Sequence, residues 1–315
     1  MEGQRVSGGG APHLPSRREV RVLEDAVDLT RAAAAEVVGA LARRGDDWRA
    51  GSASGASAAP FPTIALAGGS TPRALYRLLA DPAAPFRARV DWEAVRYFWG
   101  DERHVPPDDP DSNFRMAREA MLDHVQAPAA HVHRIAGEEP DAARAARLYE
   151  RELIEVFGLR RDRGNGKDES AGAAGDAGAA AREWPRFDLV LLGMGEEGHT
   201  ASLFPGSPLL ADSELPRPSA QEPLRSRRPQ RPRRLAAAVW VEKLNTWRIT
   251  LTPDVLDHAA TVIFLISGAA KAAALAAVLE GEWRPELYPA QVVAPVDGRL
   301  LWLVDRAAAA QLRRL

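Results

Sequence analysis

The stretch that decides the fold is residues 187–205, which read Phe187-Asp-Leu-Val-Leu-Leu-Gly-Met-Gly-Glu-Glu-Gly-His199-Thr-Ala-Ser-Leu-Phe-Pro205. The apolar run Phe187–Leu192 predicts a buried strand. Glycines at Gly193, Gly195 and Gly198 then permit a sharp turn and a close approach of the backbone to a ligand. His199 follows where a short helix is predicted to begin, and imidazole suits proton transfer near neutral pH. The stretch therefore predicts a strand that delivers a histidine to a glycine-rich catalytic turn.

The same glycines match the Gly-x-Gly-x-x-Gly fingerprint of dinucleotide-binding proteins, but the sequence around them excludes this interpretation. The fingerprint requires a full crossover helix, a second strand and an acidic residue about twenty positions further on. Pro205, Gly206 and Pro208 end the predicted helix after about two turns. Residues 213–234 beyond them are rich in proline and arginine and predict a loop. The sequence thus predicts no nucleotide cofactor.

Helical and strand patterns alternate along the rest of the chain, and several of the strands are continuous apolar runs. This pattern is typical of an α/β fold with a mainly parallel sheet covered by helices. The predicted helices cover residues 24–44, 72–80, 112–124, 139–157, 253–258, 269–280 and 305–314. The predicted strands cover residues 19–22, 63–67, 95–99, 187–192, 237–241, 248–251, 261–266 and 301–304.

Composition excludes several classes of function. The 315 residues carry a formal net charge of −2, which gives no electrostatic reason to expect nucleic acid or an anionic membrane as a partner. The chain has no cysteine, so disulfides, thiol nucleophiles and thiolate metal sites are excluded. No apolar stretch approaches the roughly 20 residues that span a bilayer, and the N-terminal residues lack the apolar core of a signal peptide. We expect a cytoplasmic enzyme.

Low-complexity segments flank and interrupt the predicted core. Residues 1–17 predict a disordered tail, and residues 18–315 the catalytic domain. Residues 161–182 and 213–234 predict flexible insertions, which a compact scaffold tolerates because loop-closure entropy grows slowly with length. Residues 51–60 predict a shorter loop of glycine, serine and alanine.

A second candidate site follows another predicted strand. Gly68 and Gly69 permit an unusual loop path, and Ser70 or Thr71 can cap the helix that comes next. Free backbone N–H groups and two hydroxyls at a helix N-terminus favour phosphate binding. The same residues also suit an ordinary helix cap, and the lack of a Gly-Lys-Ser/Thr ending excludes a Walker loop.

Charged residues crowd the end of a third predicted strand. Asp101 and Arg103 follow residues 95–99, at the sheet edge that carries the other candidates. The guanidinium can bind an anionic substrate through two hydrogen bonds, and the carboxylate can orient His199 if the two loops meet. Residues 111–113, Asp-Ser-Asn, predict a helix N-cap. Charge clusters are also common in solvated turns, so both interpretations stay open.

Lys271 lies in the first turn of its predicted helix, where the dipole favours anions. A bound phosphate would remove this conflict. The chain is rich in arginine, and its lysines are Lys167, Lys243 and Lys271.

His131 and His133 are expected at the surface or in a turn. Since the histidines show no metal-ligand spacing with partner carboxylates, the sequence predicts no metal site.

Together these motifs resemble those of the 6-phosphogluconolactonase family, a branch of the larger group that includes glucosamine-6-phosphate deaminase and ribose-5-phosphate isomerase. They occur in the family's order across about residues 20–312. The matching motifs are Gly68-Gly69-Ser70-Thr71-Pro72, Asp101-Glu102-Arg103-x-Val105-Pro106, Ser112-Asn113-Phe114, residues 193–205, Arg248-Ile249-Thr250-Leu251-Thr252, Gly268-x-x-Lys271, and Pro289-Ala290-Gln291 with Leu301-Trp302. Each is weak alone, but their joint occurrence is highly specific.

The resemblance implies a single-domain, three-layer α/β/α fold with a Rossmann-like sheet, similar to glucosamine-6-phosphate isomerase, without a metal or cofactor. It implies hydrolysis of 6-phosphoglucono-δ-lactone, a small sugar-phosphate lactone, to 6-phosphogluconate in the oxidative pentose phosphate pathway. We expect a monomer or a small homo-oligomer.

The resemblance also implies roles for individual residues. His199 would be the general base that activates water for attack on the lactone carbonyl, and Asp101 would orient the site. Backbone N–H groups of the loop containing Gly195 and Gly198 are expected to stabilise the oxyanion. The residues expected to bind the substrate's phosphate are Gly68, Gly69, Ser70, Thr71, Arg103, Arg248 and Lys271.

Two positions depart from the family's pattern, and two alternatives stay open. Glu197 stands where the family usually has aspartate, and Lys243 lies in a segment that lacks the family's Lys-Pro-Pro, so the role of Lys243 is left open.

The first alternative function is a deaminase or isomerase of an amino-sugar phosphate; Arg103 and residues 203–205 resemble the lactonase branch instead. A non-catalytic sugar-phosphate sensor is the more distant alternative, because no basic recognition helix or separate domain is visible.

Overall fold

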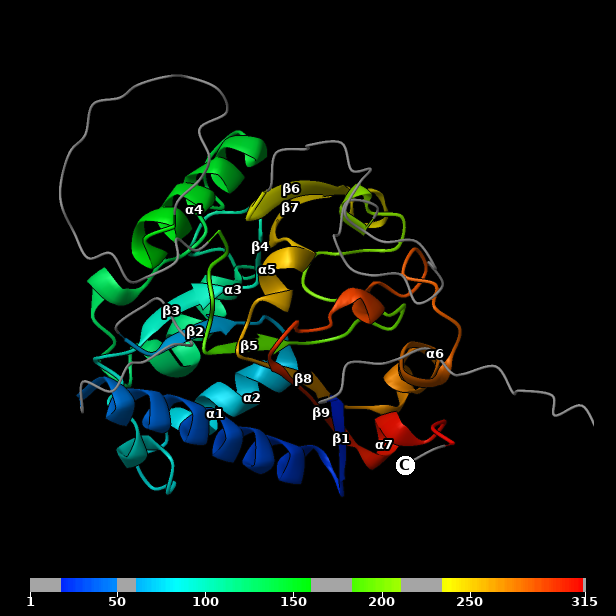
Figure 1. Cartoon of the computed structure of the whole chain (residues 1–315), viewed down its shortest axis with the longest axis horizontal. Coiled ribbons are helices and arrows are strands. Elements are labelled where there is room, and N and C mark those ends of the chain that lie inside the picture. The colour runs from blue at the N-terminus through cyan, green and yellow to red at the C-terminus, as the bar shows by residue number, and fades with distance from the viewer. Residues whose placement is uncertain (1–17, 50–60, 160–182, 211–233, 314–315) are drawn as a thin grey trace, which may run out of the picture.

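The computed structural model describes residues 18–49, 61–159, 183–210 and 234–313 (Figure 1). Its centre is a six-stranded sheet of order β1-β9-β8-β5-β2-β3, in which every pair of neighbouring strands is parallel. The strands are β1 (Arg18–Leu23), β2 (Thr63–Leu66), β3 (Arg96–Trp99), β5 (Leu189–Leu192), β8 (Thr261–Ile266) and β9 (Arg299–Asp305). The predicted α/β fold with a mainly parallel sheet is confirmed.

The strand order creates a topological switch between β2 and β5. The chain runs from β2 to β3 in one direction, and from β5 through β8 to β9 in the other. Ligands of open parallel sheets bind beyond the carboxyl ends of the strands at such a switch. The loops that leave β2 and β5 are the glycine-rich segments singled out in the sequence, so the fold brings both to this point.

Helices cover the sheet on both faces. In Figure 1, α1 and α2 lie on one side of the sheet, and α4 lies on the other. The helices are α1 (Ala26–Arg49), α2 (Ser70–Ala80), α3 (Asn113–Ala117), α4 (Ala142–Phe157), α5 (Pro253–Asp257), α6 (Ala272–Glu280) and α7 (Arg306–Ala309). A π-helical turn, Arg118–Leu122, continues α3, and a 3₁₀ turn, Ala269–Lys271, precedes α6.

The strands at the switch are buried by helices on both faces, as their apolar runs predict. All four residues of β2 and of β5 are buried. On α4, Asp141 caps the first turn, Gly158 ends the helix in a left-handed conformation, and the buried residues fall on one face. Tyr149 of that face donates a hydrogen bond to the carbonyl of Trp99, 2.9 Å away, which fixes α4 to the end of β3.

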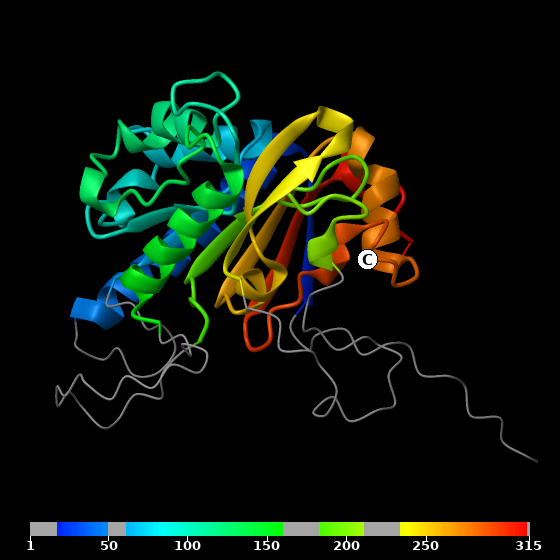
Figure 2. The same cartoon turned by 90° about the horizontal axis from the view of Figure 1, so that it is seen from above.

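A second, antiparallel sheet of three strands was not predicted. It has the order β4-β7-β6 and consists of β4 (Asp101–Arg103), β6 (Ala236–Val241) and β7 (Thr246–Leu251). Figure 2 shows the β6–β7 hairpin, in yellow, lying across the central sheet. Residues 101–106 were predicted to lie in a charged loop or turn after the strand at residues 95–99. They become a strand only through pairing with β7.

Three local predictions are wrong. No helix begins at His199, because Ala201 has a φ of 46° and Thr200 forms a bridge with Leu203. No side chain caps α2, whose N-cap residue is Gly69. His133 is buried rather than at the surface, and its ring stacks on Phe98 with centroids 4.6 Å apart. In addition, α7 ends at residue 309, five residues before the predicted end.

The predicted tail at residues 1–17, the loop at 51–60 and the insertion at 161–182 lie outside the described residues. The insertion predicted at 213–234 also lies outside them, except for its last residue. Within the described ranges, no helix is both long and apolar enough to cross a membrane.

Candidate active site

A cavity of about 240 Å³ lies at the topological switch, beyond the carboxyl ends of β2, β3 and β5. It continues into a second hollow of about 360 Å³, which shares Asp101, Arg103, Gly195, His199 and Lys271 with the first. The predicted site residues that line the two hollows are Gly68, Gly69, Asp101, Arg103, Gly195, His199, Arg248 and Lys271. The fold thus brings together candidates from five different segments of the chain.

The turn after β5 holds His199 in place. The amide of Gly195 donates to the carbonyl of His199 at 2.8 Å, and the Thr200 hydroxyl donates to the carbonyl of Gly193 at 2.8 Å. The imidazole stacks on Phe204 with ring centroids 4.1 Å apart. A Cβ atom at Gly195 would lie 2.0 Å from the imidazole Nδ1, so only glycine fits there. Backbone and ring contacts therefore fix the imidazole at the cavity wall.

The environment favours the neutral form of this imidazole. Burial lowers the pKa of His199 below its ordinary value of 6.5, and Lys271 acts in the same direction. Glu197 and Asp101 oppose the shift without reversing it. A neutral imidazole can accept a proton from water, which is the property that a general base needs near neutral pH.

Glu197 lies between His199 and a lysine. One carboxylate oxygen, Oε2, lies 3.4 Å from Nδ1 of His199, and the other accepts a hydrogen bond of 3.0 Å from Nζ of Lys243. Burial opposes ionisation, but the Lys243 hydrogen bond and the charges of His199 and Lys243 leave the pKa of Glu197 lowered. An ionised carboxylate beside Nδ1 favours the tautomer that carries its proton on Nδ1, and Nε2 is then the basic nitrogen. The longer side chain at this position thus keeps a carboxylate against the histidine.

Asp101 contacts serine and asparagine side chains. Its Oδ2 accepts a hydrogen bond of 2.6 Å from the Ser202 hydroxyl, and the Asn113 amide donates to its carbonyl at 2.9 Å and to Oδ1 at 3.3 Å. A Cβ at Gly68 would come within 1.9 Å of Oδ1 of Asn113. The loops after β2, β3 and β5 are therefore locked together around Asp101.

Glu102 points away from the cavity and shapes the loop that carries its neighbours. It is 2% exposed, and its carboxylate accepts hydrogen bonds from the backbone amides of Arg103, Asn113 and Phe114 at 2.7–2.8 Å. Burial raises its pKa, and these amide hydrogen bonds oppose the rise. Ser112 caps α3 by accepting from the amide of Arg115, so the N-cap predicted at residues 111–113 is confirmed.

Positive charge gathers on one side of the hollow. Arg103 of β4 and Arg248 of β7 are directly opposite each other in the antiparallel pair. Burial lowers the pKa of Arg248, and the charge of Arg103 lowers it further. Like charges at opposed positions destabilise a sheet, and Lys271 lines the same hollow. Three cations held close together in a concave site are suited to a phosphate dianion.

The remaining predicted residues lie elsewhere. Ser70 and Thr71 line a separate pocket of about 450 Å³ together with Thr30 and Ser267. Gly198 does not line the site; it takes a φ of 80° and its carbonyl accepts a hydrogen bond from the amide of Ala290 at 2.9 Å. These residues therefore shape the surrounding loops.

Sequence reasoning missed three functional neighbours. It placed Asn113 only in a helix N-cap and assigned no role to Ser202, although both stand inside the motifs that carried the resemblance, and it left the role of Lys243 open. Spacing gives no sign that the Ser202 hydroxyl reaches Asp101 across about one hundred positions. Among the described residues, no cluster of three or more histidine, aspartate and glutamate side chains could hold a metal ion.

The fold and the site define a class of α/β proteins in which a histidine, carboxylates and a group of cations meet at the switch point of a parallel sheet. The chain belongs to the family described as glucosamine-6-phosphate isomerases/6-phosphogluconolactonase, which it matches over residues 28–302.

Relatives and solved structures agree with this membership. The chain is 38% identical over 251 residues to a 6-phosphogluconolactonase of Synechocystis sp., covering 80% of this chain and 85% of the relative. It is 36% identical over 255 residues to a 6-phosphogluconolactonase of Mycobacterium tuberculosis, covering 79% and 84%. The structure of the Trypanosoma brucei 6-phosphogluconolactonase superposes with a TM-score of 0.67 at 26% identity, over 94% of this chain and 99% of that one.

Proposed function

We propose that this protein hydrolyses 6-phosphoglucono-δ-lactone to 6-phosphogluconate, the second step of the oxidative pentose phosphate pathway. Relatives named 6-phosphogluconolactonase match about four fifths of the chain at up to 38% identity. The observation that carries the proposal is the position of His199, a partly buried imidazole of lowered pKa beside a group of three cations. Lactone hydrolysis needs one base and one anchor for the phosphate, and this arrangement supplies both.

We assign the proton transfers to His199. The imidazole removes a proton from water as the oxygen attacks the lactone carbonyl, and it returns that proton to the ring oxygen as the ester bond breaks. Glu197 stabilises the imidazolium that forms between the two steps, because its carboxylate lies 3.4 Å from Nδ1. Backbone amides of the 193–198 turn are candidates to stabilise the tetrahedral oxyanion.

We assign the phosphate to the three cations of the site. Arg103, Arg248 and Lys271 line the outer hollow, and the loop of Gly68 and Gly69 closes the inner one. Asp101 orients the site through its contacts with Asn113 and Ser202. This anchor keeps the lactone carbonyl close to His199.

A deaminase acting on an amino-sugar phosphate remains the second candidate. A monomeric glucosamine-6-phosphate deaminase shares the fold, with a TM-score of 0.64 at 19% identity. At that identity the likeness concerns the fold alone, whereas the lactonase relatives are similar across the sequence. The cytoplasmic location, the monomeric or small oligomeric state and the catalytic domain at residues 18–315 remain predictions.

The test is an enzyme assay with two substrates. Freshly generated 6-phosphoglucono-δ-lactone is hydrolysed in the presence of 6-phosphogluconate dehydrogenase, which reports the product, and the spontaneous rate is subtracted. We expect strong acceleration with the lactone and no ammonia from glucosamine 6-phosphate. Release of ammonia without acceleration of lactone hydrolysis would overturn the proposal in favour of the deaminase.

A further inference from the structure

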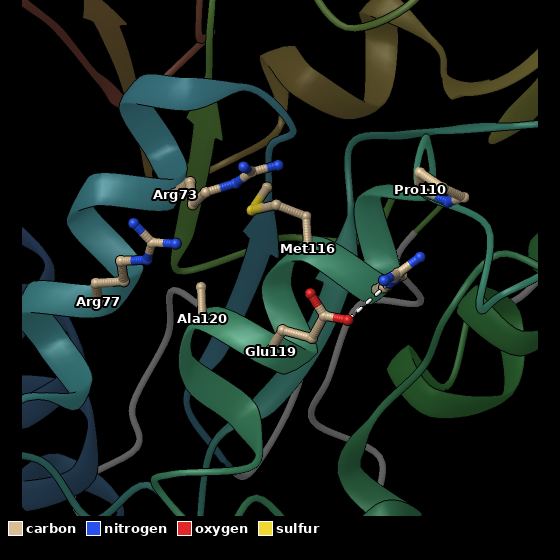
Figure 3. A pocket seen from close by; sticks show the side chains of 7 residues that line it. Arg73, Arg77, Pro110, Met116, Glu119 and Ala120 are labelled. Atoms are coloured by element: carbon tan, nitrogen blue, oxygen red, sulfur yellow. Dashed lines mark hydrogen bonds and ion pairs between the residues drawn. The ribbon is translucent and has the colours of Figure 1, made fainter.

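A second cavity of about 240 Å³ lies on the outer surface between α2 and α3, apart from the active site. Its lining residues are Arg73, Arg77, Pro110, Arg115, Met116, Glu119 and Ala120, and none of them lines the active-site hollows. Figure 3 shows Arg73 and Arg77 extending from α2 toward the segment that carries Met116, Glu119 and Ala120. Three guanidinium groups and one carboxylate give this cavity a formal charge of +2.

Neither Arg73 nor Arg77 makes an ion pair or a side-chain hydrogen bond within the described part of the chain, and the charge of Glu119 reaches Arg73 only without direct contact. They stand four positions apart on one face of α2, a spacing at which like charges repel. Arg73 also lies near the N-terminus of α2, where the helix dipole favours anions. Two unfavourable electrostatic features, the like-charge spacing and the position of Arg73 in the helix dipole, therefore coincide in this cavity, and one bound anion would relieve both.

The third guanidinium is already oriented. Arg115 donates from Nε to Glu119 at 2.7 Å and from a terminal nitrogen to the carbonyl of Asp108 at 2.8 Å. The Glu119 hydrogen bond raises the pKa of Arg115, so the guanidinium of Arg115 stays protonated. The floor of the cavity is apolar, since Met116 and Ala120 are almost fully buried. The cavity thus combines a fixed cation, two cations that make no ion pair or side-chain hydrogen bond in the described part of the chain, and a small apolar base.

We propose that this cavity is a second anion site, which binds a small phosphomonoester. The formal charge of +2 matches the dianion that a phosphomonoester carries at neutral pH. Guanidinium groups bind phosphate oxygens through paired hydrogen bonds. The apolar base leaves room beside the phosphate for a short carbon chain. The proposal does not depend on the reaction at the active site.

Methionine methyl groups allow the two sites to be observed separately. Met116 lines the proposed site, whereas Met194 lines the active-site cavity. The chain has four methionines, so a spectrum of protein labelled with ¹³C at the methionine methyl groups is simple, and Met116→Leu assigns the resonance. The probes are glycerol 3-phosphate and inorganic phosphate, each titrated at low and at physiological salt.

We expect glycerol 3-phosphate to shift the Met116 resonance along a saturable curve at both salt concentrations. The double variant Arg73→Gln/Arg77→Gln should weaken that binding roughly tenfold or more, because it removes charge-assisted hydrogen bonds. It should leave the Met194 titration and the lactone hydrolysis rate unchanged. The matched control is Arg89→Gln/Arg151→Gln, which removes two exposed arginines outside the cavity and should change neither titration.

Saturation by inorganic phosphate alone would keep the anion site and assign it to free phosphate rather than to an ester. The proposal is overturned if Met116 does not respond to either probe, or if the response persists unchanged in the Arg73→Gln/Arg77→Gln variant. If the wild type showed no response of Met194 to either probe, or no acceleration of lactone hydrolysis, that result would instead count against the proposed function. Thermal unfolding of each variant checks that it is folded.

Discussion

At the scale of single residues, the pKa of His199 results from two opposing effects, burial and the charge of nearby carboxylates. Burial disfavours the imidazolium, while the carboxylates of Glu197 and Asp101 favour it. Because burial prevails, the base is unprotonated below the pH at which an ordinary histidine loses its proton. Glu197 can then stabilise the charge that develops only during the reaction, which is the contribution that accelerates a chemical step.

The charge of Glu197 should set the acid limb of the pH profile. In Glu197→Gln the pKa of His199 falls further, since a carboxylate that raises it is lost, and the acid limb of kcat/KM moves to lower pH. Glu197→Asp keeps the charge and should leave the limb close to that of the wild type. The measurement is kcat/KM between pH 5 and 8 for the three proteins. The substrate phosphate also titrates in this range, but it contributes equally to all three profiles.

A limb that stays in place in Glu197→Gln, or one that moves to higher pH, would contradict this account of the site's electrostatics. A fall in kcat without a change of the limb would restrict Glu197 to positioning the ring.

At the scale of elements, the site depends on how three loops pack against one another. The turn after β5 carries His199, the short strand β4 directly after β3 carries Asp101 and Arg103, and the loop after β2 approaches Asn113 at Gly68. None of these loops could hold its geometry alone, because the contacts that fix them cross from one strand end to the next.

Gly195→Ala tests this packing. The added Cβ would lie 2.0 Å from Nδ1 of His199, so the imidazole has to move. Displacement of a catalytic group by about 1 Å costs on the order of 10²-fold in rate, and we expect a loss of kcat of that size in the lactone assay. Gly193→Ala is the matched control in the same turn, since its Cβ meets no atom within 4 Å. Equal losses in both variants would show that the turn tolerates no side chain for reasons unrelated to His199.

Sequence reasoning identified most elements because their signals are local. The apolar run at residues 187–192 and the cap at Ser112 depend on neighbours within a few positions, and both predictions are confirmed. Strand β4 could not be predicted, because Asp101–Arg103 forms a strand only where β7 pairs with it from about 150 positions away. The predicted helix after His199 failed for a local reason that single letters do not reveal, namely the left-handed backbone of Ala201.

At the scale of the whole molecule, the protein buries an ionisable carboxyl group that does not line the site. Asp257, at the end of α5, is 1% exposed, and its Oδ1 accepts a hydrogen bond of 2.6 Å from the amide of Ala294. Its Oδ2 has no hydrogen-bond partner among the described residues. Burial raises the pKa of Asp257 well above its ordinary value of 3.8, so ionisation of this carboxyl opposes folding.

The stability of Asp257→Asn relative to the wild type should therefore depend on pH. The folded-state pKa is raised, so the wild type loses stability as pH rises from the unfolded-state value toward the folded-state value. The variant does not titrate, and its free energy of unfolding relative to the wild type should increase by about 1.4 kcal/mol per pH unit within that window. Urea denaturation of both proteins from pH 4 upward measures this slope. A difference that does not change with pH would contradict the raised pKa.

The central claim is that this parallel-sheet switch point hydrolyses a phosphorylated lactone with His199 as its base. The most direct test compares wild type and His199→Ala in the coupled assay of 6-phosphoglucono-δ-lactone hydrolysis, with KM measured for both. We predict that the acceleration above the spontaneous rate falls by at least about 10²-fold, the lower end of a general base's contribution, while KM changes little. Acceleration that survives the substitution in full would contradict the assignment of His199 as the base.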